Sequence, residues 1–199
     1  MDMTLIDRKE IYIEQLGEQA VEAHELPDFI RKSFGMKGRL ISGMGEDAIE
    51  DGIHSAELIY HPMWIVRNTV VATRRPFKPK RIPNMIFVDA VSGYRGLLST
   101  VPSISEIKVE KDKVITPIID AQAVGRYIKD VQSNQIDRSY VLKKPDHEQS
   151  KPRLVHLPLW KVEMEGRSGR ETHYINANTG ASENFMSSRW ASGADLMKH

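Results

Sequence analysis

The sequence YHPMWIV, residues Tyr60–Val66, recurs later in the chain as HLPLWKV, residues His156–Val162. When the two tryptophans are aligned, the prolines and most of the flanking apolar residues also match. A second match lies downstream, where FVDAVSG at Phe87–Gly93 aligns with YINANTG at Tyr174–Gly180. A chain that repeats two phrases in the same order is expected to contain one structural unit twice.

The first phrase of each copy predicts a β-strand. Alternate residues of YHPMWIV point to opposite faces of an extended chain, and tryptophan and β-branched residues favour strands. Proline cannot donate a hydrogen bond to a neighbouring strand. We therefore expect Pro62 and Pro158 to lie at a sheet edge or a bulge.

The second phrase of each copy predicts a tight turn. Asp89 or Asn176 can accept a hydrogen bond from a nearby backbone amide in an Asx turn. Gly93 or Gly180 supplies the positive φ that closes a type I turn followed by a bulge. The residues after each glycine can then return as a further strand.

At these turns, over 87–94 and 174–181, the sequence resembles PepSY-type domains. These are small α+β modules in which a helix precedes strands carrying a Tyr-x-Val-Asp-Ala-x-Thr-Gly-like turn. The second copy departs from that pattern at Asn176, where the family has aspartate. The resemblance implies a non-catalytic binding or inhibitory module, often outside the cytoplasm, and it assigns no functional residue to this chain.

A helix is predicted ahead of each copy. LPDFIRKSFG, which starts at Leu26, and DAQAVGRYIKDVQ, which starts at Asp120, both have helical apolar spacing. We therefore expect an α+β fold of two related units, each a helix with antiparallel strands, forming one larger sheet or two packed halves. The expected boundaries are a peripheral N-terminal segment at 1–16, interpreted as a helix, repeats at 17–105 and 106–186, and a flexible tail at 187–199.

The composition excludes several chemistries. The chain has 199 residues, a net charge of +1 and no cysteine, so disulfides, thiolate nucleophiles and iron–sulfur clusters are ruled out. Its start is acidic, without the basic and then apolar regions of a secretory signal. No apolar stretch approaches the roughly 18 residues of a membrane span. We expect a cytoplasmic protein with no membrane partner.

No catalytic, metal-binding or phosphate-binding motif is present, which favours a protein that is not an enzyme and needs no cofactor. His61 and His156 fall on opposite strand faces when the copies are aligned, so they do not predict a metal site. The acidic cluster at 46–51 is interpreted as a solvated helical turn, and the glycine-rich stretch at 35–45 as a flexible connector.

A basic loop separates the two phrases of the first copy. The offset between copies falls from 96 residues to 87, so the first copy has nine extra residues there. Insertions at a hairpin tip cost little stability and often carry function. Five cations surround Phe77 in this loop and form a candidate anion-binding site: Arg74, Arg75, Lys78, Lys80 and Arg81. A plain solvated loop is the alternative interpretation.

Three functional hypotheses follow. The first is a non-catalytic binding or assembly module that contacts a protein or another anionic partner, nucleic acid being the less favoured form, through the basic loop. The second is a small enzyme or ligand-binding protein with a pocket between the repeats, lined by Trp64 and Trp160. A tryptophan on an inner strand face is more often part of the core. The third is a homo-oligomer whose edge strands pair between chains.

Overall fold

The computed structural model describes residues 9–34, 46–166 and 169–197. The glycine-rich connector at 35–45 lies outside the described residues. In the described part, the strands are β1 (Glu10–Leu16), β2 (Ile53–Arg74), β3 (Phe77–Asp89), β4 (Arg95–Leu98), β5 (Ile104–Glu110), β6 (Asp146–Gln149), β7 (Arg153–Gly166) and β8 (Gly169–Asn176). The α-helices are α1 (Leu26–Ser33), α3 (Glu46–Gly52), α4 (Val124–Val131) and α5 (Asn184–Ser192). The α+β class is confirmed.

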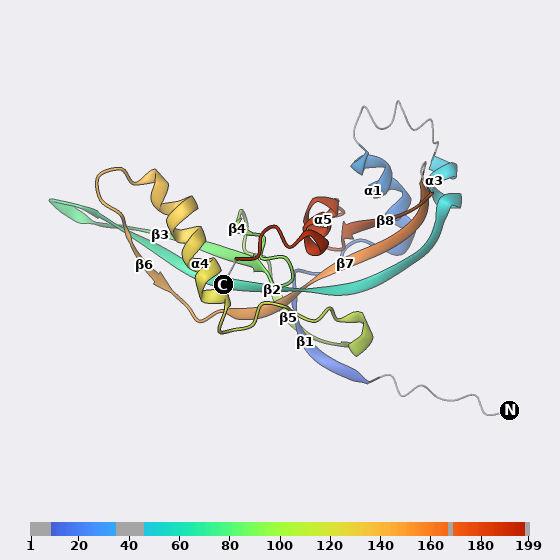
Figure 1. Ribbon diagram of the computed structural model, residues 1–199, viewed down its shortest axis with the longest axis horizontal. Coiled ribbons are helices and arrows are strands. Elements are labelled where there is room, and N and C mark those ends of the chain that lie inside the picture. Colours follow the sequence, from blue (N-terminus) through green and yellow to red (C-terminus); the bar gives the residue numbers. More distant parts are fainter. Residues whose placement is uncertain (1–8, 35–45, 167–168, 198–199) are drawn as a thin grey trace. The chain divides into compact units, whose positions relative to one another are not determined.

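The strands form one mixed and mostly antiparallel sheet (Figure 1). Its order is β4-β3-β2-β7-β1-β5, with β6 paired to β2 and β8 paired to β7. Helix α3 covers the acidic cluster at 46–51, as expected for a helical turn. No helix in the described ranges is long and apolar enough to cross a membrane.

Two compact units divide the chain, and each combines segments from both predicted repeats. The first unit comprises Met1–His61, Ser103–Ile115 and His156–Ser187, and the second comprises Pro62–Pro102, Thr116–Val155 and Ser188–His199. The predicted boundary between residues 105 and 106 therefore falls inside the first unit. The long strands β2 and β7 each contribute residues to both units.

The core of the first unit lies between α1 and the β7–β8 hairpin. Leu26 and Ile30 are fully buried on one face of α1, four residues apart as helical packing requires. They belong to one apolar cluster with Val162 and Met164 of β7 and Ile175 of β8. The helix ahead of the first predicted repeat thus packs on the hairpin of the second.

The second unit shows the reciprocal arrangement. Val124, Ile128 and Val131 are buried on α4 and share a cluster with Val66 of β2 and Val88 of β3. The helix ahead of the second predicted repeat thus packs on the hairpin of the first. The two compact units therefore differ from the predicted repeats, which grouped each helix with the strands that follow it in the sequence.

Both units place a tryptophan against the segment that leads into the helix. The indole Nε1 of Trp160 donates to the carbonyl oxygen of Val21 at 2.9 Å in the first unit. In the second unit, the indole of Trp64 donates to the carbonyl oxygen of Ile119 at 2.7 Å. Each acceptor lies five residues before the start of its helix, so the indole anchors the segment that leads into the helix.

The turns are also fixed in the same way. The carbonyl oxygen of Ala177 accepts hydrogen bonds from the amides of residues 20 and 21, both at 2.9 Å. The carbonyl oxygen of Ala90 accepts from the amides of residues 118 and 119, both at 2.8 Å. These bonds hold each turn against the segment ahead of the helix that covers it.

The turn glycines meet an aromatic ring of that helix. Gly93 and Gly180 have φ values of +79° and +73°, as the turn pattern predicts. A methyl group placed on Gly180 would lie 2.0 Å from Cε1 of Phe29 on α1. One placed on Gly93 would lie 2.8 Å from Cε1 of Tyr127 on α4. Glycine is therefore required for both the backbone conformation and the close approach.

The repeated prolines lie in central strands, which corrects the expectation of a sheet edge. Pro62 and Pro158 come one residue before the first residue that pairs with the hairpin partner. Each proline carbonyl accepts an amide from the turn, at 3.1 Å from Ala90 and 3.0 Å from Ala177. The missing proline N–H is tolerated because each hairpin ladder ends at that point.

The two ends of the chain also differ from expectation. Residues 10–16, interpreted as part of a helix, form β1, which pairs antiparallel with β5. In the predicted tail, Trp190 of α5 donates to Oδ2 of Asp89 at 2.9 Å. Arg189 and Asp195 form an ion pair in the same segment. The tail therefore contributes contacts to the second unit.

Candidate anion-binding arm

The basic loop forms the distal part of the β2–β3 hairpin. We call residues 71–82 the arm. Its strands remain paired from Val71 and Arg81 out to Arg74 and Phe77, and every residue from 73 to 81 is exposed. In Figure 1 the hairpin tip extends beyond α4 at the left of the view. Residues 73–81 of the arm thus form a two-stranded projection with solvent on both faces.

Four of the five candidate cations are available for a partner. Arg74, Arg75, Lys78 and Lys80 are exposed and make no ion pair with any described residue. Arg81 instead binds both carboxylate oxygens of Glu148 on β6. This hydrogen bonding raises the pKa of Arg81 and lowers that of Glu148. The structure therefore separates Arg81 from the other four.

A buried polar network lies where the arm leaves the body. Asn68 of β2 is 1% exposed, and its Nδ2 donates to Asn84 at 3.1 Å and to Nδ1 of His147 at 3.2 Å. Gln132 donates to Oδ1 of Asn68 at 3.1 Å. Since Nδ1 of His147 accepts, its Nε2 carries the proton that is donated to Asp137 at 2.9 Å. The network pins the register of β2, β3 and β6.

Sequence reasoning missed this network, although one signal was available. Asn68 stands at an inward position between Val66 and Val70, where the alternation of the strand calls for an apolar residue. A polar residue at such a position must find partners inside the protein.

A second loop lies beside the arm. Residues 140–145 connect a 3₁₀ turn at Asp137–Ser139 to β6. In this loop, Nζ of Lys143 donates to Oγ1 of Thr73 at 3.4 Å. Val141 is 90% exposed and Leu142 is fully exposed in this loop, while Phe77 at the arm tip is 73% exposed. Exposed apolar side chains thus accompany the cations in both loops.

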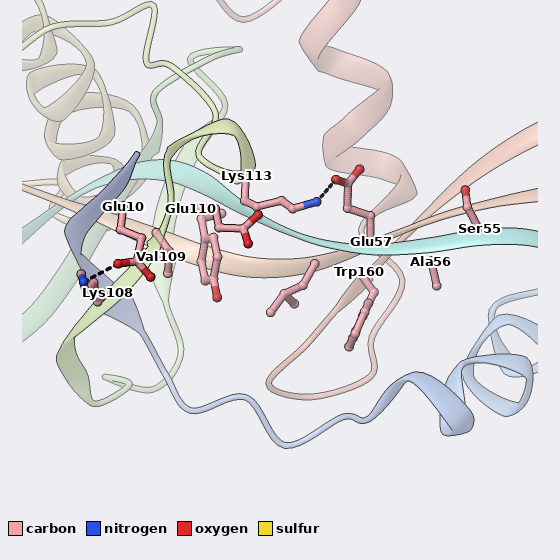
Figure 2. Close-up of a pocket in the computed structure, with 11 residues that line it drawn as sticks. Glu10, Ser55, Ala56, Glu57, Lys108, Val109, Glu110, Lys113 and Trp160 are labelled. Carbon is pink, nitrogen blue, oxygen red and sulfur yellow. Dashed lines mark hydrogen bonds and ion pairs between the residues drawn. The ribbon is translucent and has the colours of Figure 1, made fainter. Parts of the chain in front are cut away.

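The first unit contains an open hollow of about 710 Å³ (Figure 2). Its apolar wall includes Leu58, Tyr60, Val109 and Trp160, and burial raises the pKa of Tyr60. Figure 2 shows two ion pairs at its rim, Lys113 with Glu57 and Lys108 with Glu10. The hollow thus offers an aromatic surface beside alternating charges.

The two predicted pocket tryptophans belong to different units. Trp160 lines the hollow and packs on the core of the first unit. Trp64 is 8% exposed within the core of the second unit and does not line that hollow. Each indole N–H already binds a backbone carbonyl, which is an architectural role.

The described histidines do not cluster with carboxylates as metal ligands would. Within the described residues, no group of three or more histidine and carboxylate side chains could hold a metal ion. His61 and His156 are both buried in the first unit and interact electrostatically, although they fall on opposite faces in the sequence alignment of the copies. His61 lies on β2 and His156 on β7, which are neighbours in the sheet order, and the sequence does not reveal this strand order.

No family model, curated protein or solved structure matches this chain.

Proposed function

We propose that this protein is a non-catalytic binding module that contacts an anionic partner through the arm. One observation carries the proposal: the exposed cations Arg74, Arg75, Lys78 and Lys80 have no ion-pair partner among the described residues. The polar network around Asn68 supports it, because a fixed base presents these charges in a defined direction. Pre-positioned charges lose less side-chain and loop entropy when a partner binds.

Charge reversal tests this proposal. The variant carries Arg74→Glu, Arg75→Glu and Lys78→Glu, and binding to labelled polyglutamate and oligothymidine is measured by fluorescence anisotropy across a salt series. We expect at least a tenfold loss of affinity and a shallower salt dependence. The thermal midpoint should not change, because these side chains are exposed and make no ion pair within the described part of the protein.

A matched control reverses three exposed cations of the first unit, Lys9, Lys111 and Arg170. It has the same net charge as the arm variant, so a general electrostatic effect would weaken binding equally in both. Unchanged binding by the arm variant, or equal losses in the two variants, overturns the proposal.

We also infer that the two units arose from an internal duplication in which the helices cover the hairpin of the other copy. The paired contacts support this inference: the tryptophan bonds, the alanine carbonyls of the turns and the glycine–aromatic contacts occur at equivalent positions. A random pairing of helices and hairpins would not reproduce all three.

A second candidate function is ligand binding in the hollow of the first unit. The aromatic wall formed by Tyr60 and Trp160 beside the Lys113–Glu57 ion pair favours a small zwitterion with an apolar group. Titration with dipeptides, followed by NMR, should shift the signals of Trp160 and Lys113. Shifts that are spread over the surface instead would count against this site.

A further inference from the structure

Two separate loops of the second unit have the same surface chemistry. The arm tip places Phe77 between Arg75 and Lys78, and the loop ahead of β6 places Val141 and Leu142 before two lysines. All three apolar side chains are at least 73% exposed. Large apolar side chains at such exposure cost solubility and often mark an interaction surface.

These loops lie at the same end of the second unit (Figure 1). Asp146, at the start of β6, pairs with Val71 at the base of the arm, and Lys143 contacts Thr73. Arg74 then pairs with Phe77 at the tip. The two loops are therefore neighbours at one end of the second unit, and we call their exposed apolar and cationic side chains together the tip surface.

We infer that the tip surface docks on an anionic lipid surface. This inference rests on the proposed function and specifies its partner. Phe77, Val141 and Leu142 would enter the boundary between headgroups and acyl chains, and the four unpaired cations of the arm would contact headgroup phosphates. It departs from the sequence-based expectation that there is no membrane partner.

The aliphatic side chains discriminate between a lipid surface and nucleic acid. Phe77 could stack on a base, but Val141 and Leu142 have no planar face to stack and no group to bind a phosphate. An acidic peptide in water would likewise leave them solvated. A lipid surface satisfies the apolar and the cationic side chains together.

The acidic residues nearby do not cancel this charge. Glu148 of β6 is paired with Arg81 of β3. Asp146 lies opposite Val71, farther from the tip than the Arg74–Phe77 pair. The net charge therefore becomes more positive toward the tip.

The test uses co-sedimentation with phosphatidylcholine vesicles, with and without phosphatidylserine. We expect binding only to the vesicles that contain phosphatidylserine. The apolar variant Phe77→Ser, Val141→Ser, Leu142→Ser should reduce this partitioning at least tenfold. The cation variant Arg74→Gln, Arg75→Gln, Lys78→Gln, Lys80→Gln should reduce it about fivefold per removed charge at low salt.

Two controls separate the lipid inference from the proposed function. Binding of labelled oligothymidine and polyglutamate should be weakened by the cation variant and unchanged in the apolar variant. The variant Val101→Ser, Ile118→Ser removes exposed apolar side chains elsewhere in the second unit and should leave vesicle binding unchanged.

The alternative outcomes distinguish lipid docking from the anionic-partner proposal. Full vesicle binding by the apolar variant overturns lipid docking and leaves the anionic-partner proposal standing. Loss of oligothymidine binding in the apolar variant also overturns lipid docking and favours nucleic acid. Failure of the unmodified protein to bind vesicles, oligothymidine or polyglutamate overturns both.

Discussion

The two units make the same contacts between helix and hairpin, yet each carries a different addition. The first unit adds β1 and β5, which line the hollow together with β2 and β7. The second unit adds the arm at the end of its β2–β3 hairpin. In the first unit, the equivalent strand β7 ends at Gly166 and has no such extension. Contacts present in both units are architectural, and the additions are where a specific function can be placed.

The two turns show how the hydrogen-bonding groups around a position decide between aspartate and asparagine. Asp89 is fully buried, and its carboxylate accepts from the amide of Val91 at 2.8 Å, the hydroxyl of Ser92 at 2.8 Å and the indole of Trp190 at 2.9 Å. Asn176 instead donates its amide to Glu183 at 2.9 Å. Aspartate suits a site surrounded by donors, and asparagine suits a site that includes an acceptor.

The comparison of the turns predicts the largest loss of stability at their glycines. Gly180→Ala and Gly93→Ala each force a side chain into a positive-φ conformation and against an aromatic ring. We expect a loss of about 3 kcal/mol in the free energy of unfolding for each, from backbone strain and overpacking together. Urea denaturation measures both values.

Gly125→Ala is the matched control. Gly125 lies on the exposed side of α4, and a methyl group there would meet nothing within 4 Å. This variant should gain up to about 1 kcal/mol from helix propensity. If Gly180→Ala were as stable as the control, the tight contact with Phe29 would not hold in solution.

Exchanging the turn residues should destabilise both units, for opposite reasons. Asn176→Asp places a carboxylate against that of Glu183, whose pKa burial already raises. We expect a loss of about 2 kcal/mol near neutral pH. Because repulsion raises the folded-state pKa values of the pair, the lost stability should return as the pH falls toward the ordinary carboxyl pKa.

Asp89→Asn should lose a similar amount without this recovery at acid pH, because the indole N–H of Trp190 would lose a charged acceptor. Adding Glu183→Gln to Asn176→Asp should restore most of the stability. A double variant as unstable as the single one would contradict the assigned repulsion.

The tryptophans predict a smaller and unequal effect. Trp64→Phe leaves the carbonyl of Ile119 without its donor inside a core, at a cost of about 2 kcal/mol. Trp160→Phe should cost about 1 kcal/mol, because the half-buried site lets water replace the indole. Equal losses, measured by urea denaturation, would show that exposure does not distinguish the two sites.

Sequence reasoning recovered the local structure because each signal is local. The hairpin strands, the Asx turns with Gly93 and Gly180, and the presence of α1 and α4 follow from residues close in the chain. The local patterns were wrong at 10–16, which form β1 and not a helix, and at 181–185, which lead into α5 and not into a further strand. The packing of each helix on the hairpin of the other predicted repeat does not follow from local residues. Both helices have the same apolar spacing, so nothing in either sequence specifies which hairpin it covers.

The candidate site was likewise only partly visible. The cations of the arm stand together in the sequence, whereas Glu148, which removes Arg81 from the set, is 67 residues away. Val141 and Leu142 join the tip surface only because β6 pairs with β2. Such relations depend on strand pairing across the fold, which composition does not reveal.

Buried histidines give the first unit a predicted sensitivity to acid. Burial lowers the pKa of His156 and of His173 below their ordinary value of 6.5, and His61 lowers that of His156 further. Below about pH 6.5 the unfolded chain therefore binds more protons than the folded chain. The free energy of unfolding should fall as the pH drops through this range. Each histidine contributes at most about 1.4 kcal/mol per pH unit to the slope of the free energy of unfolding against pH.

Substitution separates these histidines from the other titrating groups. His156→Gln and His173→Gln should each make the dependence of the urea midpoint on pH less steep between about pH 5 and pH 6.5. His24→Gln, at an exposed position of the same unit, should not change it. The raised pKa of Glu183 acts in the opposite sense, because it contributes stability below the ordinary carboxyl pKa that is lost as the pH rises. A slope that persists in the double histidine variant would place the acid sensitivity outside these two side chains.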